Sequence, residues 1–205
     1  MNAPDRFVLQ VPESWPDADL SGESLTEMRA AALARTDDPR QKAAINDMFR
    51  QGRELVRAAR SHGALYGAGT VTLFDEGVFM ANVMVFAVSA PAGRELNLAT
   101  LSAQLGGPAA KGKALSDRVV TSVEIPEVGT AARVTAVEEV SLTADVKMKV
   151  LTMHTVIPVP TAPRNYLLVS CSSPNLPLRA DVYDLFDAIT HTFRYVHSAE
   201  KPAAV

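Results

Sequence analysis

Three groups of residues have types and spacings that suit chemistry, and the first contains glycines and lysines. The stretch Gly107-Pro-Ala-Ala-Lys-Gly-Lys113 fits G-x-x-x-x-G-K, the spacing of a loop that wraps phosphate groups. Ala114, however, stands where that loop needs a Ser or Thr hydroxyl for Mg²⁺, and the stretch follows an expected helix instead of a strand. We therefore interpret residues 106–117 as a basic surface loop and not as a nucleotide site.

The second group is a histidine with three potential nucleophiles. His154 lies in one expected strand, and Ser170, Cys171 and Ser172 lie in or just after the next one. A histidine acting as general base on a serine or cysteine would make the chain a small hydrolase or transferase. The competing interpretation is a partly buried structural histidine and an inert core thiol, because Cys171 has apolar neighbours and no basic cluster to lower its pKa.

The third group is acidic and lies near the end of the chain. Asp181, Asp184 and Asp187 recur every three residues on the last expected helix, where a solvated acidic face is favoured over a cation site. No two of the 4 histidines show H-x-x-x-H spacing, and the single cysteine excludes a cysteine-rich metal site. We therefore predict no catalytic residues, no metal and no cofactor.

Composition sets the size and class of the protein. The 205 residues are 47% hydrophobic and 21% charged, which is enough to close one core, so we expect a single domain over residues 1–197 and a loose tail over 198–205. The net charge of −3 disfavours a nucleic-acid partner. Because the sequence shows neither a secretory signal pattern nor a window of about 18 apolar residues, we expect a cytoplasmic protein without membrane attachment.

The candidate residues must be positioned by strands that alternate in polarity and by helices with an apolar stripe. We expect strands at residues 6–11, 64–74, 78–88, 118–125, 130–142, 146–157 and 164–171, helices at 24–35, 39–61 and 96–105, and a last helix that carries Val182 to Phe193. Most connections between strands are short and contain Gly, Pro or Asp, which favours antiparallel neighbours. The predicted fold class is α+β, with an antiparallel sheet of six to seven strands and helices mainly on one face.

Local signals mark where the helices begin and what they bury. The spacing of Ser24 and Glu27 predicts a capping box, and Asp38 before Pro39 predicts the start of the longest helix. The last helix carries an apolar stripe, which we expect to pack on the sheet. Its members are Val182, Leu185, Phe186, Ile189 and Phe193. Two glycines at positions 67 and 69 predict a close approach of a helix to that strand.

Both ends of the chain resemble those of a PsbP-like domain. The resemblance rests on Val11-Pro-Glu-Ser-Trp15 and on Phe186-Asp-Ala-Ile-Thr-His-Thr-Phe-Arg194. That family includes extrinsic photosystem proteins, Ran-binding Mog proteins and bacterial LpqN-type lipoproteins. The resemblance implies a compact α+β domain whose members mostly bind or assemble, and it offers no catalytic residue to carry over. The chain departs from the family by lacking the leader of LpqN-type proteins and by having two helices over residues 24–61.

The leading expectation is therefore a non-catalytic protein-binding or assembly module. Lys111 and Lys113, in the loop over residues 106–117, are the predicted contacts to an acidic protein partner. The alternatives are the hydrolase or transferase built on His154 and a small-ligand carrier with a pocket between the sheet and helix 39–61. The sequence leaves the partner's identity and homo-oligomer formation open.

Overall fold

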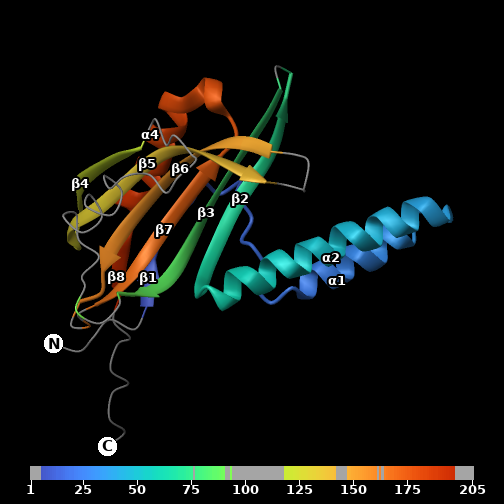
Figure 1. Cartoon of the computed structure of the whole chain (residues 1–205), viewed down its shortest axis with the longest axis horizontal. Coiled ribbons are helices and arrows are strands. Elements are labelled where there is room, and N and C mark those ends of the chain that lie inside the picture. The colour runs from blue at the N-terminus through green and yellow to red at the C-terminus, as the bar shows by residue number, and fades with distance from the viewer. Residues whose placement is uncertain are drawn as a thin grey trace, which may run out of the picture.

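A six-stranded antiparallel sheet forms the centre of the protein (Figure 1). The computed structural model describes residues 6–75, 77–90, 93, 118–141, 147–160, 162 and 164–196. The sheet has the order β2-β3-β7-β6-β5-β4, and every neighbouring pair is antiparallel. The strands are β2 (Ala64–Phe74), β3 (Gly77–Ser89), β4 (Val119–Ile125), β5 (Gly129–Ser141), β6 (Lys147–Pro158) and β7 (Asn165–Ser173). The α+β prediction is confirmed, and β7 is central, as its apolar sequence indicated.

A second, two-stranded sheet joins the two ends of the described chain. Strand β1 (Arg6–Val8) pairs antiparallel with β8 (Arg194–Val196), and Phe7 lies opposite Tyr195. Sequence reasoning missed β8, because three residues are too few to show a period. Phe7 stacks on Phe193 with 5.6 Å between ring centroids, so the small sheet is tied to the core where the last helix ends.

Helix α4 (Arg179–His191) covers one face of the six-stranded sheet. Val182, Phe186 and Ile189 are buried in the same cluster as Val169 of β7 and Leu151 of β6. The predicted apolar stripe is confirmed, since Phe193 is also buried and Leu185 packs against the cluster. A one-turn 3-10 helix, η1 (Leu176–Leu178), leads from β7 into α4.

The other two helices form a hairpin that projects away from the β2 edge of the sheet (Figure 1). Helix α1 (Glu23–Leu33) buries no residue, and α2 (Pro39–Ser61) buries only Phe49. The two helices pack mainly on each other. Only α4, among the described helices, therefore covers a face of the sheet, and no helix in the described ranges is long and apolar enough to cross a membrane.

The ends of these helices show which local signals were correct. Asp38 caps α2 by accepting a hydrogen bond from the Arg40 amide at 2.9 Å, as predicted. The capping box at Ser24 is wrong, because α1 starts after Gly22 and has no side-chain cap. The carboxylate of Asp19 instead accepts from the backbone amides of residues 21, 22 and 24. The Ser21 hydroxyl, which donates to the same carboxylate at 2.6 Å, and these amides hold the pKa of Asp19 well below its usual range.

An extended N-terminal segment lies beside β2, where the two glycines predicted a helix. The Ala18 amide donates to the Gly67 carbonyl at 2.7 Å, and the Gly69 amide donates to the Pro16 carbonyl at 3.3 Å. A Cβ on Gly67 would lie 3.2 Å from the Cβ of Ala18, so a small residue is needed there. The close approach is confirmed, but the approaching element is extended backbone.

Candidate functional site

A groove lies on the face of the sheet opposite α4, which we call the open face. Its volume is about 910 Å³. Side chains on the open face alternate with those that face α4, because successive residues of a strand point to opposite sides. The groove is lined by residues from the N-terminal segment and from five strands, with Pro174 after β7: Ser14, Pro16, Gly69, Thr70, Val71, Thr72, Met80, Ala81, Asn82, Val140, Met148, Val150, Thr152, Ser170, Ser172 and Pro174.

The groove combines hydroxyl groups at its centre with apolar side chains around them. Asn82 donates to the Ser172 hydroxyl at 2.9 Å, and Thr152 donates to a backbone carbonyl of β5 at 3.4 Å. Val71, Met80 and Val150 add apolar surface to the same lining. Such a surface suits an amphipathic ligand or an extended peptide, since pockets of mixed character bind through apolar contact and orient through a few polar groups.

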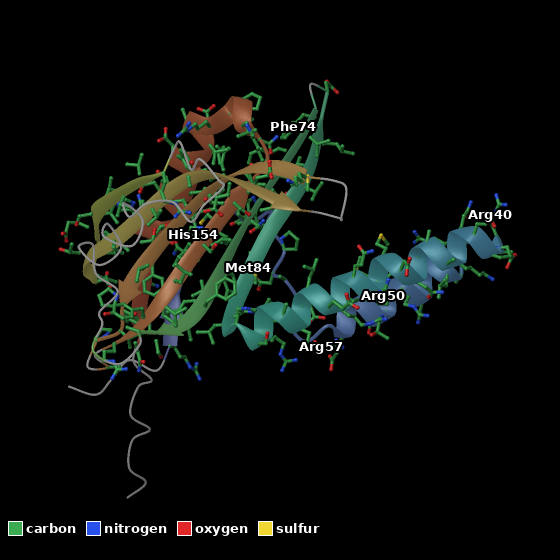
Figure 2. The ribbon with its side chains drawn as sticks, in the orientation of Figure 1. Arg40, Arg50, Arg57, Phe74, Met84 and His154 are labelled. Atoms are coloured by element: carbon green, nitrogen blue, oxygen red, sulfur yellow. The ribbon has the colours of Figure 1, made fainter. Side chains whose placement is uncertain are left out.

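His154 lies on the open face, one register step beyond the groove (Figure 2). It is directly opposite Ser170, and Ser172 lies opposite Thr152, so both serines share its face of the sheet. Cys171 points to the other face and is fully buried in the core. The proposal of Cys171 as a partner of His154 is therefore wrong, because alternation along β7 directs its thiol toward α4. Burial also raises the pKa of that thiol to about 12.

Among the described residues, His154 has no second partner of the kind that orients a general base. The Nδ1 atom of His154 is buried, and within the described ranges it has no hydrogen-bond partner. The nearest carboxylate that influences it, Glu138, is held by Arg118 at 3.1 Å. Ser170 and His154 are thus neighbours, but the described side chains do not assemble the nucleophile, base and orienting group of a catalytic triad.

The environment of His154 predicts a pH dependence of stability. Burial lowers the pKa of His154 from its ordinary value of 6.5, with Glu138 opposing the shift and Arg118 adding to it. Above about pH 6.5 the histidine is neutral in both the folded and the unfolded protein. Its protonation therefore takes nothing from the free energy of unfolding in that range. Below that pH the unfolded chain binds a proton that the folded protein resists, and stability falls.

We expect His154→Gln to reduce this loss. Urea denaturation at about pH 7.5 and about pH 5.5 should show a smaller difference in the free energy of unfolding for the variant than for the natural chain. His62→Gln is the matched control, because that histidine is exposed at the end of α2. An equal pH dependence in His154→Gln and the natural chain would contradict the prediction.

A buried arginine on the face toward α4 was missed by sequence reasoning. Arg133 of β5 donates to the Thr155 hydroxyl at 3.2 Å and forms an ion pair with Asp187 of α4. The Asp187 carboxylate also lies 3.2 Å from Nδ1 of His191. Asp187 is therefore part of a structural ion pair and not only of a solvated acidic face. The sequence did contain a signal for it: by strand alternation, Arg133 falls on the same side of β5 as apolar residues.

Strand β2 is an edge of the sheet, and part of that edge has no neighbour among the described residues. The N-terminal segment uses the Gly67 carbonyl and the Gly69 amide, which shows that odd-numbered residues of β2 turn their backbone groups outward. Val71 and Leu73 therefore point their N–H and C=O groups away from β3. We call residues 70–74 the free edge of β2.

Apolar side chains beside the free edge are strongly exposed. Val71 is 68% exposed and Leu73 is 79% exposed, and their register partners Met80 and Val78 are 40% and 45% exposed. These four residues share the open face at the tip of the β2–β3 hairpin, and we call them the hairpin patch. Val71 and Met80 also line the groove, so the patch and the groove form one continuous surface.

Several predicted positions fall outside these surfaces. Lys111, Lys113, the helix at 96–105 and the tail at 198–205 lie outside the described residues. The groove is lined by no residue of α2, so it is not the carrier pocket predicted between the sheet and helix 39–61, and that pocket stays a prediction. In the described ranges, no group of three or more His, Cys, Asp and Glu side chains has the geometry of a metal site.

Comparison with known proteins identifies no relative. No protein-family model matches the chain, and no curated protein matches it. The resemblance to PsbP-like domains therefore stays a prediction.

Proposed function

We propose that the protein is a binding module that captures an extended segment of another protein along the free edge of β2. The observation that carries the proposal is the outward-facing backbone of Val71 and Leu73 together with the exposed apolar side chains beside it. An added strand would pair with these backbone groups, as in recognition by β-augmentation. Its inward side chains would enter the groove.

The sequence of β2 supports this role. The strand Ala64–Phe74 contains no charged residue and no proline, the features with which edge strands normally prevent pairing with other chains. The partner's side chains that face the hairpin patch should be apolar and should alternate with polar ones, because side chains of an extended segment alternate between faces. The leading functional expectation from the sequence and the PsbP-like resemblance both agree with this class of protein.

Proline at position 71 provides a direct test. Val71→Pro removes an outward amide that takes no part in the β2–β3 ladder, and proline is tolerated at such edge positions. For a peptide selected from a random phage-displayed library, we expect the variant to bind about tenfold or more weakly, measured by fluorescence anisotropy. Val71→Thr is the matched control, because it keeps the amide and a β-branched side chain; its loss should be smaller.

Two further measurements make the outcome decisive. Urea denaturation should show that Val71→Pro remains folded, and peptide binding should slow hydrogen exchange at the amides of Val71 and Leu73. Equal affinity for both variants, without protection at these amides, would overturn the proposal. A β2-to-β2 dimer that dissociates on Val71→Pro would also overturn it, because the occupant of the edge would then be a second copy of this chain.

A further inference from the structure

A second cavity lies where the helical hairpin meets the rest of the protein. Its volume is about 430 Å³. It is lined by the last turns of α2 and by the residues just before α1: Ser21, Gly22, Arg53, Val56, Arg57, Arg60 and Ser61. Ser61 precedes the first residue of β2 by only three positions, whereas the free edge of β2 is at the other end of that strand. The cavity is therefore distinct from the surface proposed for peptide binding.

Three arginines of one helix face line this cavity. Arg53, Arg57 and Arg60 are at positions i, i+4 and i+7, which places them on one stripe of α2. None of them forms an ion pair with a carboxylate in the described part of the chain. Like charges at this spacing repel one another, so the stripe carries positive charge that an anion would neutralise.

Arg50 of the same helix shows the contrast. It lies 3.0 Å from a carboxylate oxygen of Asp47 and 3.5 Å from one of Glu54. Figure 2 shows Arg50 near the middle of the hairpin and Arg57 at the end nearer the sheet. The arginine one turn away from the cavity is thus paired with carboxylates of its own helix, whereas the three arginines at the cavity are not.

The acidic residue just before α1, Asp19, is already occupied by hydrogen bonds. Asp19 accepts hydrogen bonds from the Ser21, Gly22 and Ser24 amides at 2.7, 3.2 and 2.7 Å, and from the Ser21 hydroxyl at 2.6 Å. These donors satisfy its carboxylate, and within the described residues Asp19 forms no ion pair with the arginines. The same bonds use the amides at the start of α1, so the side chains of α2 are the groups left to bind a ligand.

We propose that this cavity binds a phosphate group. Guanidinium groups bind phosphate oxygens in a bidentate manner, and three of them around one cavity match a doubly charged or higher anion better than a single carboxylate. The Ser61 hydroxyl lies at the wall of the cavity, but its proton is donated to the Ala58 carbonyl at 2.8 Å, so the guanidinium groups supply the donors for the phosphate oxygens. The phosphate belongs either to a small soluble molecule or to a phospholipid headgroup.

Titration with inorganic pyrophosphate tests the soluble source. In low-salt buffer we expect saturable binding by calorimetry, with amide chemical-shift changes concentrated at residues 21, 22 and 61. The double variant Arg53→Gln/Arg57→Gln should lose about tenfold or more in affinity. Arg50→Gln is the control for loss of positive charge from the same helix outside the cavity; it removes one charge where the double variant removes two, and its affinity should change by less than about twofold.

Vesicles test the lipid source. Sedimentation with phosphatidylcholine vesicles, with and without phosphatidylglycerol, should show binding only to the anionic vesicles if the ligand is a headgroup, and the double variant should again lose it. Binding in either arm that depends on Arg53 and Arg57 supports the site. No binding in both arms, or an equal loss in Arg50→Gln, overturns it, because the interaction would then be absent or a nonspecific effect of net charge.

Discussion

Replacing Phe186 with alanine is expected to lower the free energy of unfolding by about 3 to 5 kcal/mol. The Phe186 ring is fully buried between α4 and the sheet, in the cluster that contains Val169 and Leu151. Its removal takes away both the transfer free energy of a large ring and the contacts that hold α4 in place, and the two strands beneath it cannot collapse into the space. Urea denaturation followed by circular dichroism measures the change.

A substitution on the opposite side of the same helix separates packing from helix propensity. Asp184 is exposed, so Asp184→Ala should change stability by no more than about 0.5 kcal/mol. A loss below about 1 kcal/mol for Phe186→Ala would show that α4 is not anchored by its apolar stripe. The result matters for the proposed function, because α4 supports the sheet from the face opposite the groove.

Asp187→Ala is expected to destabilise the protein by about 3 kcal/mol, through charge and not through volume. Its partner, the Arg133 side chain, is only 8% exposed, whereas the Asp187 side chain is 41% exposed. Removing the carboxylate leaves a guanidinium buried without a counterion, which usually costs about 3 to 5 kcal/mol of stability. We expect about the lower end of that range, because the Asp187 side chain reaches solvent. The free energy of unfolding at neutral pH is again the quantity to measure.

A double-mutant cycle shows whether the cost comes from the unpaired charge. Arg133→Met removes the charge and keeps a long apolar side chain, so Arg133→Met/Asp187→Ala should be more stable than Asp187→Ala alone. If the two substitutions are additive, no pairing energy exists between β5 and α4, and the prediction is wrong. High salt should change the cost little, since the arginine is shielded from solvent.

These predictions bear on the two proposed surfaces in different ways. The groove and the free edge of β2 belong to the sheet on which α4 packs. The cavity at Arg53, Arg57 and Arg60 belongs to the helical hairpin, which packs little on the sheet. Loss of α4 packing should therefore weaken peptide binding before it weakens phosphate binding.

The sequence alone determined most of the elements. Asp38 and Pro39 indicated where α2 starts, and the pattern over residues 64–74 identified β2. The stripe containing Val182 and Phe186 identified the buried side of the last helix. These signals are local: they depend on residues a few positions apart, whose preferences act before any tertiary contact forms.

Only the tertiary structure decided which side chains of those elements lie together in a site. The register of β6 against β7 places His154 beside Ser170 and sends Cys171 to the opposite face. The Arg133–Asp187 pair joins residues 54 positions apart. The net charge of −3 gave no indication of the arginine stripe on α2. Strand order makes β2 an edge, which no period within β2 reveals. Register, strand order and ion pairing arise from contacts between distant residues, and a local pattern carries no information about them.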